Sequence, residues 1–159
     1  MTAAILTVSD SCFRKERVDQ SGPALRDMLV AKGFEVVAMA ICPDERIPIE
    51  NSLIELCDKA RLVLSTGGTG LAERDVTPEA TDSVGDRHVP GLAERIRHEG
   101  ALKTPFAALS RGISVVRNKS LIVNLPGSPK GATESLATIV DLLPHALELL
   151  AGKTEHRNL

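Results

Sequence analysis

The sequence predicts an α/β protein of three layers, in which helices cover both faces of a mostly parallel central sheet with an antiparallel edge. Two observations lead to this prediction. Short apolar runs alternate with helical patterns over residues 3–66, and parallel strands require such crossover helices between them. Over residues 113–127, two apolar runs follow each other around a short polar turn, which is typical of an antiparallel strand pair.

The first half of the chain has the order strand, helix, strand, helix, strand. Residues 3–10 are an apolar run that ends in polar residues, and the helix after it begins at Ser21 and stops at Gly33. Residues 34–44 form the second strand. The apolar face of the next helix consists of Ile49, Leu53, Leu56, Cys57 and Ala60. The third strand ends at Ser65, where a glycine-rich segment begins.

The second half of the chain places helices before and after the strand pair. A short helix begins at Thr77, and a longer one follows Pro90. Two strands then flank residues 117–119. The last helix has Ser128 as its N-cap, with a proline at its first position. Its buried stripe consists of Leu136, Ile139, Val140 and Leu143. Pro144 should break or kink this helix.

Length and composition restrict the classes of function. A chain of 159 residues, 43% of them hydrophobic, suits one domain with one core. We expect that domain to span residues 1–152, with residues 153–159 as a short tail. The net charge is −2 and the chain has three Phe but no Trp or Tyr, so a basic or base-stacking surface for nucleic acid is not expected.

The cysteines and the N-terminus indicate a cytoplasmic protein. Cys12, Cys42 and Cys57 are far apart and have no CxxC pairing, which favours reduced thiols. We expect Cys57 in the core and Cys12 as a loop thiol without a catalytic role. The stretch MTAAILTVSD lacks the pattern of a signal peptide, and no segment approaches the ~20 apolar residues of a membrane span.

Polar or glycine-rich turns follow four of the predicted strands. In an open parallel sheet, ligands bind outside the carboxyl ends of the strands. The four turns should therefore lie together along one rim, which we take as the candidate binding site. They are Ser9-Asp10-Ser11, Pro43-Asp44-Glu45, residues 65–70 and residues 124–128.

The segment STGGTG exposes much backbone directly after a buried strand. Gly67, Gly68 and Gly70 can adopt backbone angles closed to other residues, so their N–H groups can converge on a phosphate. The helix that begins near Thr77 would add its positive end. The segment matches neither the Walker loop nor the dinucleotide fingerprint, since Glu73 replaces the required residue in both. The alternative is a tight strand-to-helix turn without a ligand.

Asp44 and Asp75 each lie just past a strand. One or two carboxylates there could bind Mg²⁺ together with phosphate oxygens of a nucleotide. Structural alternatives remain open for both residues at this point. Asp75 could pair with Arg74 or cap the helix at Thr77, and Asp44 could be an ordinary turn residue.

Several motifs in order resemble one enzyme family. With STGGTG, RDVTPEAT and NLPGSPKG, preceded by VSDSC and SGPAL, the chain resembles the molybdopterin adenylyltransferases, the group of MogA and the gephyrin G-domain. The segment TPFAALSR strengthens the match, which covers nearly the whole chain. The resemblance implies an α/β fold assembled as a homotrimer. It also implies transfer of AMP from ATP to the terminal phosphate of molybdopterin, with release of pyrophosphate, before a partner protein inserts molybdenum.

The resemblance also implies the site residues. Asp44 in CPDE and Asp75 in RDVT match the aspartates on which the family relies, as catalytic residues and as Mg²⁺ ligands. The implied nucleotide and pterin contacts are Ser9, Gly67, Gly68, Thr69, Gly70, Ser110, Pro126, Gly127 and Ser128. Since the phosphate of the pterin attacks ATP, no protein nucleophile is required, and the protein positions substrates while Mg²⁺ neutralises charge.

The chain departs from the family pattern at two places, and rival functions stay open. Gly100 stands where some members carry a serine that contacts the pterin, and PGSPKG replaces the PGSKKG of the gephyrin type. A paralogue of the MoaB type would bind pterin with little turnover. A non-catalytic trimeric assembly module is the other alternative, although the sequence shows no linker or second domain. The related competence-damage proteins have longer chains and a different acidic motif.

Overall fold

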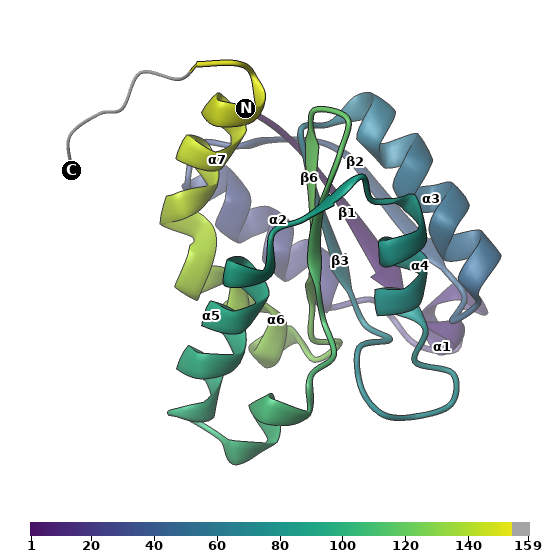
Figure 1. Ribbon diagram of the computed structural model, residues 1–159. Coiled ribbons are helices and arrows are strands. Elements are labelled where there is room, and N and C mark those ends of the chain that lie inside the picture. The colour runs from purple at the N-terminus through teal and green to yellow at the C-terminus, as the bar shows by residue number, and fades with distance from the viewer. Residues whose placement is uncertain (154–159) are drawn as a thin grey trace.

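The computed structural model describes residues 1–153 and is built around one six-stranded sheet (Figure 1). The strands are β1 (Thr2–Val8), β2 (Glu35–Cys42), β3 (Leu62–Thr66), β4 (Arg87–His88), β5 (Ser114–Arg117) and β6 (Ser120–Leu125). They lie in the order β2-β1-β3-β6-β5-β4. Strands β2, β1, β3 and β6 are parallel to their neighbours in this run, whereas β5 is antiparallel to β6 and to β4. The predicted parallel sheet with an antiparallel edge is therefore confirmed.

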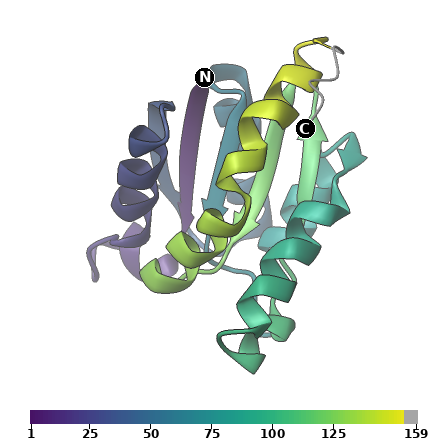
Figure 2. The same cartoon turned by 90° about the vertical axis from the view of Figure 1, so that its left-hand side faces the viewer.

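Helices cover both faces of the sheet, as the three-layer prediction requires. One face carries α2 (Ser21–Ala31), α5 (Pro90–Ala101), α6 (Pro129–Ile139) and α7 (Leu143–Leu150), which lie in front of the sheet in Figure 2. The other face carries α3 (Arg46–Lys59) and α4 (Thr77–Val84). Successive residues of a strand point to opposite faces. Accordingly, Ile5 packs with the first group of helices and Leu6 with the second, and both are fully buried.

The last helical region breaks where the proline predicts. Helix α6 ends at Ile139, a 3₁₀ turn η2 (Val140–Leu142) follows, and α7 begins at Leu143. The ring of Pro144 would clash with the carbonyl four residues earlier in a continuous helix, and it removes one backbone donor. At the other end of α6, Ser128 is the N-cap and its hydroxyl accepts a hydrogen bond from Gly131 N at 3.1 Å. The predicted stripe of four side chains is buried.

Three short elements were not predicted, and one of them changes the environment of a cysteine. They are α1 (Asp10–Phe13), η1 (Pro105–Leu109) and β4. The prediction of a loop thiol at Cys12 was wrong, because α1 turns this side chain inward and leaves it 6% exposed. Cys57 is half-buried at the margin of the core under α3, and burial raises the pKa of its thiol to about 11.

The described residues set limits on two further expectations. Within residues 1–153, no helix combines the length and apolar character needed to cross a membrane. The expected tail of residues 153–159 lies outside the described part of the chain, except for Lys153.

Candidate functional site

The candidate site lies at the rim formed by the carboxyl ends of four strands. Because β1, β2, β3 and β6 run parallel, the segments that follow them meet along one edge of the sheet, at the lower end in Figure 1. Ser9 follows β1, Asp44 follows β2, the glycine loop (residues 67–70) follows β3, and Gly127 lies beyond β6. The structure thus brings together segments that are distant in the sequence.

The glycine loop is held in place through its carbonyl groups. Gly67 and Gly68 have φ angles of +105° and +63°, which side chains rarely allow. Thr77 at the start of α4 binds both residues: its hydroxyl donates to Gly67 O at 2.9 Å, and its N–H donates to Gly68 O at 3.1 Å. No described residue accepts a hydrogen bond from the N–H of Gly68, Thr69 or Gly70. The loop therefore has free donors, as a phosphate cradle requires.

Two glycines of the loop, Gly68 and Gly70, lie against the two predicted aspartates. A Cβ added to Gly68 would lie 2.3 Å from Thr77 Oγ1 and 3.3 Å from Asp44 Oδ1. A Cβ added to Gly70 would lie 2.8 Å from Asp75 Oδ2. Each end of the loop therefore has a carboxylate beside it, and a larger residue would fill the space next to that carboxylate.

Asp44 is held by a reciprocal pair of hydrogen bonds with Asp10. Its carboxylate accepts from Asp10 N at 2.8 Å, and its own N–H donates to Asp10 Oδ1 at 3.0 Å. Burial raises the pKa of Asp44 above its usual value, and the negative charges of Asp10 and Asp75 raise it further. The hydrogen bond from Asp10 N opposes this shift. Asp44 therefore carries its charge in an environment that disfavours it.

Asp75 has neither of the two structural roles considered as alternatives. Its carboxylate accepts a hydrogen bond from Ala72 N at 3.0 Å within its own loop. Arg74 pairs with Asp10 at 2.7 Å instead of with Asp75. The N-cap of α4 is Val76, without a side-chain cap. The Asp75 carboxylate therefore keeps acceptor capacity for a ligand.

Two pockets open on either side of the glycine loop. The first, the strand-end pocket, has a volume of about 450 Å³. Of the predicted site residues, it is lined by Ser9, Asp44, Gly67, Gly68, Gly127 and Ser128. The second, the helix pocket, has a volume of about 340 Å³ and lies between α5, η1 and α6. It is lined by Thr69, Gly70, Ser110, Pro126 and Ser128. Ser128 lines both pockets, so ligands in the two pockets would meet at the start of α6.

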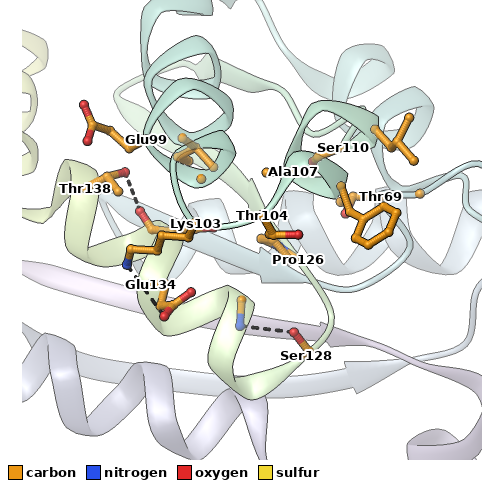
Figure 3. A pocket seen from close by; sticks show the side chains of 17 residues that line it. Thr69, Glu99, Lys103, Thr104, Ala107, Ser110, Pro126, Ser128, Glu134 and Thr138 are labelled. Carbon is orange, nitrogen blue, oxygen red and sulfur yellow. Dashed lines mark hydrogen bonds and ion pairs between the residues drawn. The ribbon is translucent and has the colours of Figure 1, made fainter.

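The lining of the helix pocket combines apolar side chains with one ion pair (Figure 3). Pro126 and Ala107 contribute apolar surface, whereas Lys103 and Glu134 face each other in an ion pair of 3.6 Å. Gly100 also lines this pocket, and a Cβ there would lie only 2.8 Å from Ala107 Cβ. At this position a serine would therefore push η1 away from α5, so the absence of a side chain matches the close approach of the two segments.

Two arginines and one aspartate of the rim were missed by the sequence reasoning. Arg111 donates to Thr69 O through its backbone, to Gly70 O through Nε at 2.8 Å, and to the carbonyl of Asp75. Its guanidinium also pairs with Glu79 on α4. The sequence signal was its place next to Ser110 in TPFAALSR. Arg74 and Asp10 were visible only as a loop residue and a turn residue.

The residues present fit a magnesium ion that is shared with a phosphate ligand. No cluster of three His, Cys, Asp or Glu side chains capable of holding a metal occurs within residues 1–153. Mg²⁺ usually takes one or two carboxylates and completes its shell with water and substrate phosphates. Asp44 and Asp75 are two carboxylates of this kind, and the free N–H groups of the glycine loop beside them suit phosphate oxygens of the same ligand.

Comparison with known proteins identifies the family. The model of the family described as "probable molybdopterin binding domain" matches residues 4–145. The chain belongs to this family. The family resemblance that the motifs indicated is thereby confirmed.

Individual relatives within the molybdopterin-binding family agree over nearly the whole chain. The molybdopterin adenylyltransferase of Helicobacter pylori strain 26695 is 40% identical over 93% of this chain and 86% of its own length. A crystal structure of the molybdopterin biosynthesis enzyme MoaB from Thermus thermophilus is 53% identical, with a TM-score of 0.90 over 96% of this chain and 97% of that chain. The molybdenum cofactor synthesis protein cinnamon of Drosophila melanogaster is 42% identical, but the match spans 26% of that protein.

Proposed function

We propose that this protein is a molybdopterin adenylyltransferase, which transfers AMP from ATP to the terminal phosphate of molybdopterin and releases pyrophosphate. The observation that carries the proposal is the glycine loop, which has free N–H donors and a carboxylate beside each end. Relatives that bear this name are about 40% identical over 93% of the chain.

The two pockets suggest how the substrates are arranged. We assign ATP to the strand-end pocket, which has the more polar lining and includes Asp44 and the loop glycines. We assign the pterin to the helix pocket, whose lining is largely apolar. Both phosphates then lie near Ser128, at the N-terminal end of α6, where a helix favours negative charge. An oxygen of the molybdopterin phosphate attacks the α-phosphorus of ATP as the bond to pyrophosphate breaks.

The protein contributes positioning to this reaction. The N–H groups of the glycine loop bind phosphate oxygens and orient them for the transfer. We propose Asp44 and Asp75 as the ligands of Mg²⁺, which when bound neutralises charge on the phosphates. The attacking oxygen belongs to the substrate, so the buried thiol of Cys12 takes no part in the reaction.

A transfer assay with paired variants tests this proposal. Purified protein, molybdopterin, ATP and Mg²⁺ should yield adenylylated molybdopterin. Asp44→Asn and Asp75→Asn should each lower the rate by at least ~10²-fold, since each removes a charge without a change of shape. The control is Asp58→Asn on the exposed side of α3, which should behave as wild type. Wild-type rates in both rim variants would contradict the assigned roles.

A second function, pterin binding without turnover, is favoured by one specific observation. Identity to the structure named MoaB is 53%, compared with 40% to the Helicobacter pylori adenylyltransferase. The same assay separates the two functions. A protein that binds molybdopterin tightly but forms no adenylylated product would be a binding paralogue.

We further propose a homotrimer that acts in the cytoplasm and passes its product to a protein that inserts molybdenum. The trimer and the downstream partner rest on the family resemblance. The location rests on Cys12, Cys42 and Cys57, which are all free thiols.

A further inference from the structure

Asp10 lies between the two proposed metal ligands and contacts the segments that carry both. Strand β1 lies between β2 and β3 in the sheet, so the residue after β1 is next to the turn after β2 and the loop after β3. On the β2 side, Asp10 exchanges two hydrogen bonds with Asp44, at 2.8 and 3.0 Å. On the β3 side, its Oδ2 accepts from Arg74 Nε at 2.8 Å.

Arg74 directly precedes Asp75 in a loop whose two ends, Gly70 O and Asp75 O, accept hydrogen bonds from Arg111. Residues 71–74 are exposed, and the loop's internal contacts are two hydrogen bonds between Ala72 and Asp75. The Arg74 side chain is 59% exposed, whereas the Asp10 side chain is 21% exposed. The pair thus connects the exposed middle of this loop, which Arg111 does not contact, to a carboxylate that is fixed by the backbone of the neighbouring turn.

We propose that Asp10 and Arg74 are positioning residues, which hold Asp44 and Asp75 at the separation needed to bind a metal–nucleotide complex. The inference rests on the proposed function, in which those two carboxylates bind Mg²⁺ together with ATP. The chain of contacts runs from Asp75 through the adjacent Arg74 to Asp10, and from Asp10 through two hydrogen bonds to Asp44.

Asp10 does not act as a third metal ligand in this arrangement. One of its oxygens accepts from Asp44 N and the other from Arg74. The positive charge of Arg74 also offsets the negative charge of the Asp10 carboxylate. Two uncompensated carboxylates remain to face the metal, and a third would add repulsion toward the phosphates of ATP.

The test measures metal binding directly, because binding can be read without turnover. Mn²⁺ replaces Mg²⁺ as a spectroscopic probe, and electron paramagnetic resonance measures free Mn²⁺ in the presence of a non-hydrolysable ATP analogue. Arg74→Gln and Asp10→Asn should each weaken Mn²⁺ binding by about tenfold or more, as loss of a group that orients metal ligands does. The double variant should be no weaker than the weaker single variant, since both changes break one contact.

Two further variants serve as controls. Arg74→Lys keeps the charge and should restore most of the affinity. Arg14→Gln breaks an exposed ion pair with Glu16, of 2.9 Å, on the same surface segment, and should bind Mn²⁺ as wild type does. Thermal melts of all variants should coincide within a few degrees, since an exposed ion pair contributes little stability.

The inference is overturned if both single variants bind Mn²⁺ with wild-type affinity, or if their losses add in the double variant. Failure of the proposed function looks different. A wild-type protein that binds Mn²⁺ and the analogue but transfers no AMP contradicts adenylyl transfer, while the same comparison of variants still decides the role of the pair. A wild-type protein that binds no Mn²⁺ with the analogue overturns both.

Discussion

Asp44 is a residue at which the proposed metal site would lower the stability of the fold. Its carboxyl group is half-buried, and burial is the main cause of its raised pKa, followed among the unfavourable effects by the nearby charges of Asp10 and Asp75. The folded state therefore holds a proton on Asp44 more tightly than the unfolded chain does. Its favourable contribution is complete below the usual value of 3.8 and is lost as pH rises through the folded pKa.

This sign leads to a prediction that separates stability from activity. Asp44→Asn should raise the thermal midpoint at pH 7, because it removes a charge that the folded state disfavours. The gain should shrink as pH falls and vanish below 3.8, where the wild-type carboxyl is protonated in both states. Calorimetric melts between pH 3 and 8 provide the measurement, at roughly half-unit steps. A gain that does not depend on pH would contradict the assignment to Asp44 ionisation.

Gly68 and Gly33 allow backbone strain to be separated from loss of the ligand site. Both have positive φ angles, +63° and +83°, but a Cβ at Gly33 would meet no atom within 4 Å. Alanine at Gly33 should cost about 1 kcal/mol of stability through strain, and alanine at Gly68 should cost more because its Cβ would also lie 2.3 Å from Thr77 Oγ1. Only Gly68→Ala should also lower ATP affinity, by roughly tenfold or more, since its Cβ displaces Thr77 or Asp44. Titration calorimetry with ATP and Mg²⁺ on the folded fraction decides; equal affinities would make the loop a simple turn.

At the scale of elements, the connection between η1 and β5 acts as a clamp on the glycine loop. Arg111 binds carbonyl groups at both ends of residues 70–75, and Glu79 of α4 holds its guanidinium from the other side. A planar guanidinium satisfies several acceptors at once, which a lysine ammonium at this distance cannot reproduce. The loop after β3 is therefore ordered by an element that follows it by some forty residues.

Removal of this clamp should loosen the loop without disturbing the sheet. Arg111→Ala leaves two carbonyls and Glu79 without their partner, and should lower the free energy of unfolding by about 1–3 kcal/mol. Hydrogen exchange should accelerate at the amides of Ala72 and Asp75, whose bonds lie inside the clamped segment. Arg95→Ala, which removes an exposed bond to Thr138 O, is the matched control. Unchanged exchange in residues 70–75 would show that Arg111 is not needed to order them.

The long elements could be predicted from the sequence because each repeats its apolar residues with a fixed period. The stripe of α6 is an example, whereas β1 was predicted from a continuous apolar run because it is buried on both faces, and Pro144 marked the end of one element. Helix α1, η1 and β4 are two to five residues long, too short for a period to show. The same limit explains the error at Cys12, which is buried only because α1 forms.

The rim could be predicted because parallel topology brings strand ends together, but its contacts could not. The bond between Arg74 and Asp10 joins residues 64 positions apart, and it depends on the path of an irregular loop. The pairing of Arg111 with Glu79 similarly depends on how η1 folds back. Motif resemblance therefore led to Asp44 and Asp75, while the residues that hold them required the structure.

At the scale of the whole molecule, the surface retains apolar side chains along one edge of the sheet. Met39 and Ile41 on the outermost strand β2 are 42% and 41% exposed. Edge strands of this kind are usually protected by charge or covered by another chain. An oligomer in which a second chain covers this edge strand would bury these side chains.

We expect the protein to sediment as a trimer of its 17.0 kDa chain. The expectation rests on the family resemblance, and burial of exposed apolar surface would favour association. Sedimentation velocity at micromolar concentrations measures the mass without a reference protein. A single monomeric species over the whole concentration range would contradict the trimer.

The pairing of β3 with β6 has a consequence for the order in which the polypeptide leaves the ribosome. Leu62 of β3 pairs with Leu121 of β6, and the hydroxyl of Ser21 donates a hydrogen bond to Gly127 O at 2.7 Å. A nascent chain that has emerged only as far as α5 already contains the glycine loop and both aspartates, yet β3 is still an open edge and one wall of each pocket has not been synthesised. The proposed nucleotide site is therefore complete only once the chain has been synthesised as far as Pro129, and a shorter translation fragment should not bind nucleotide.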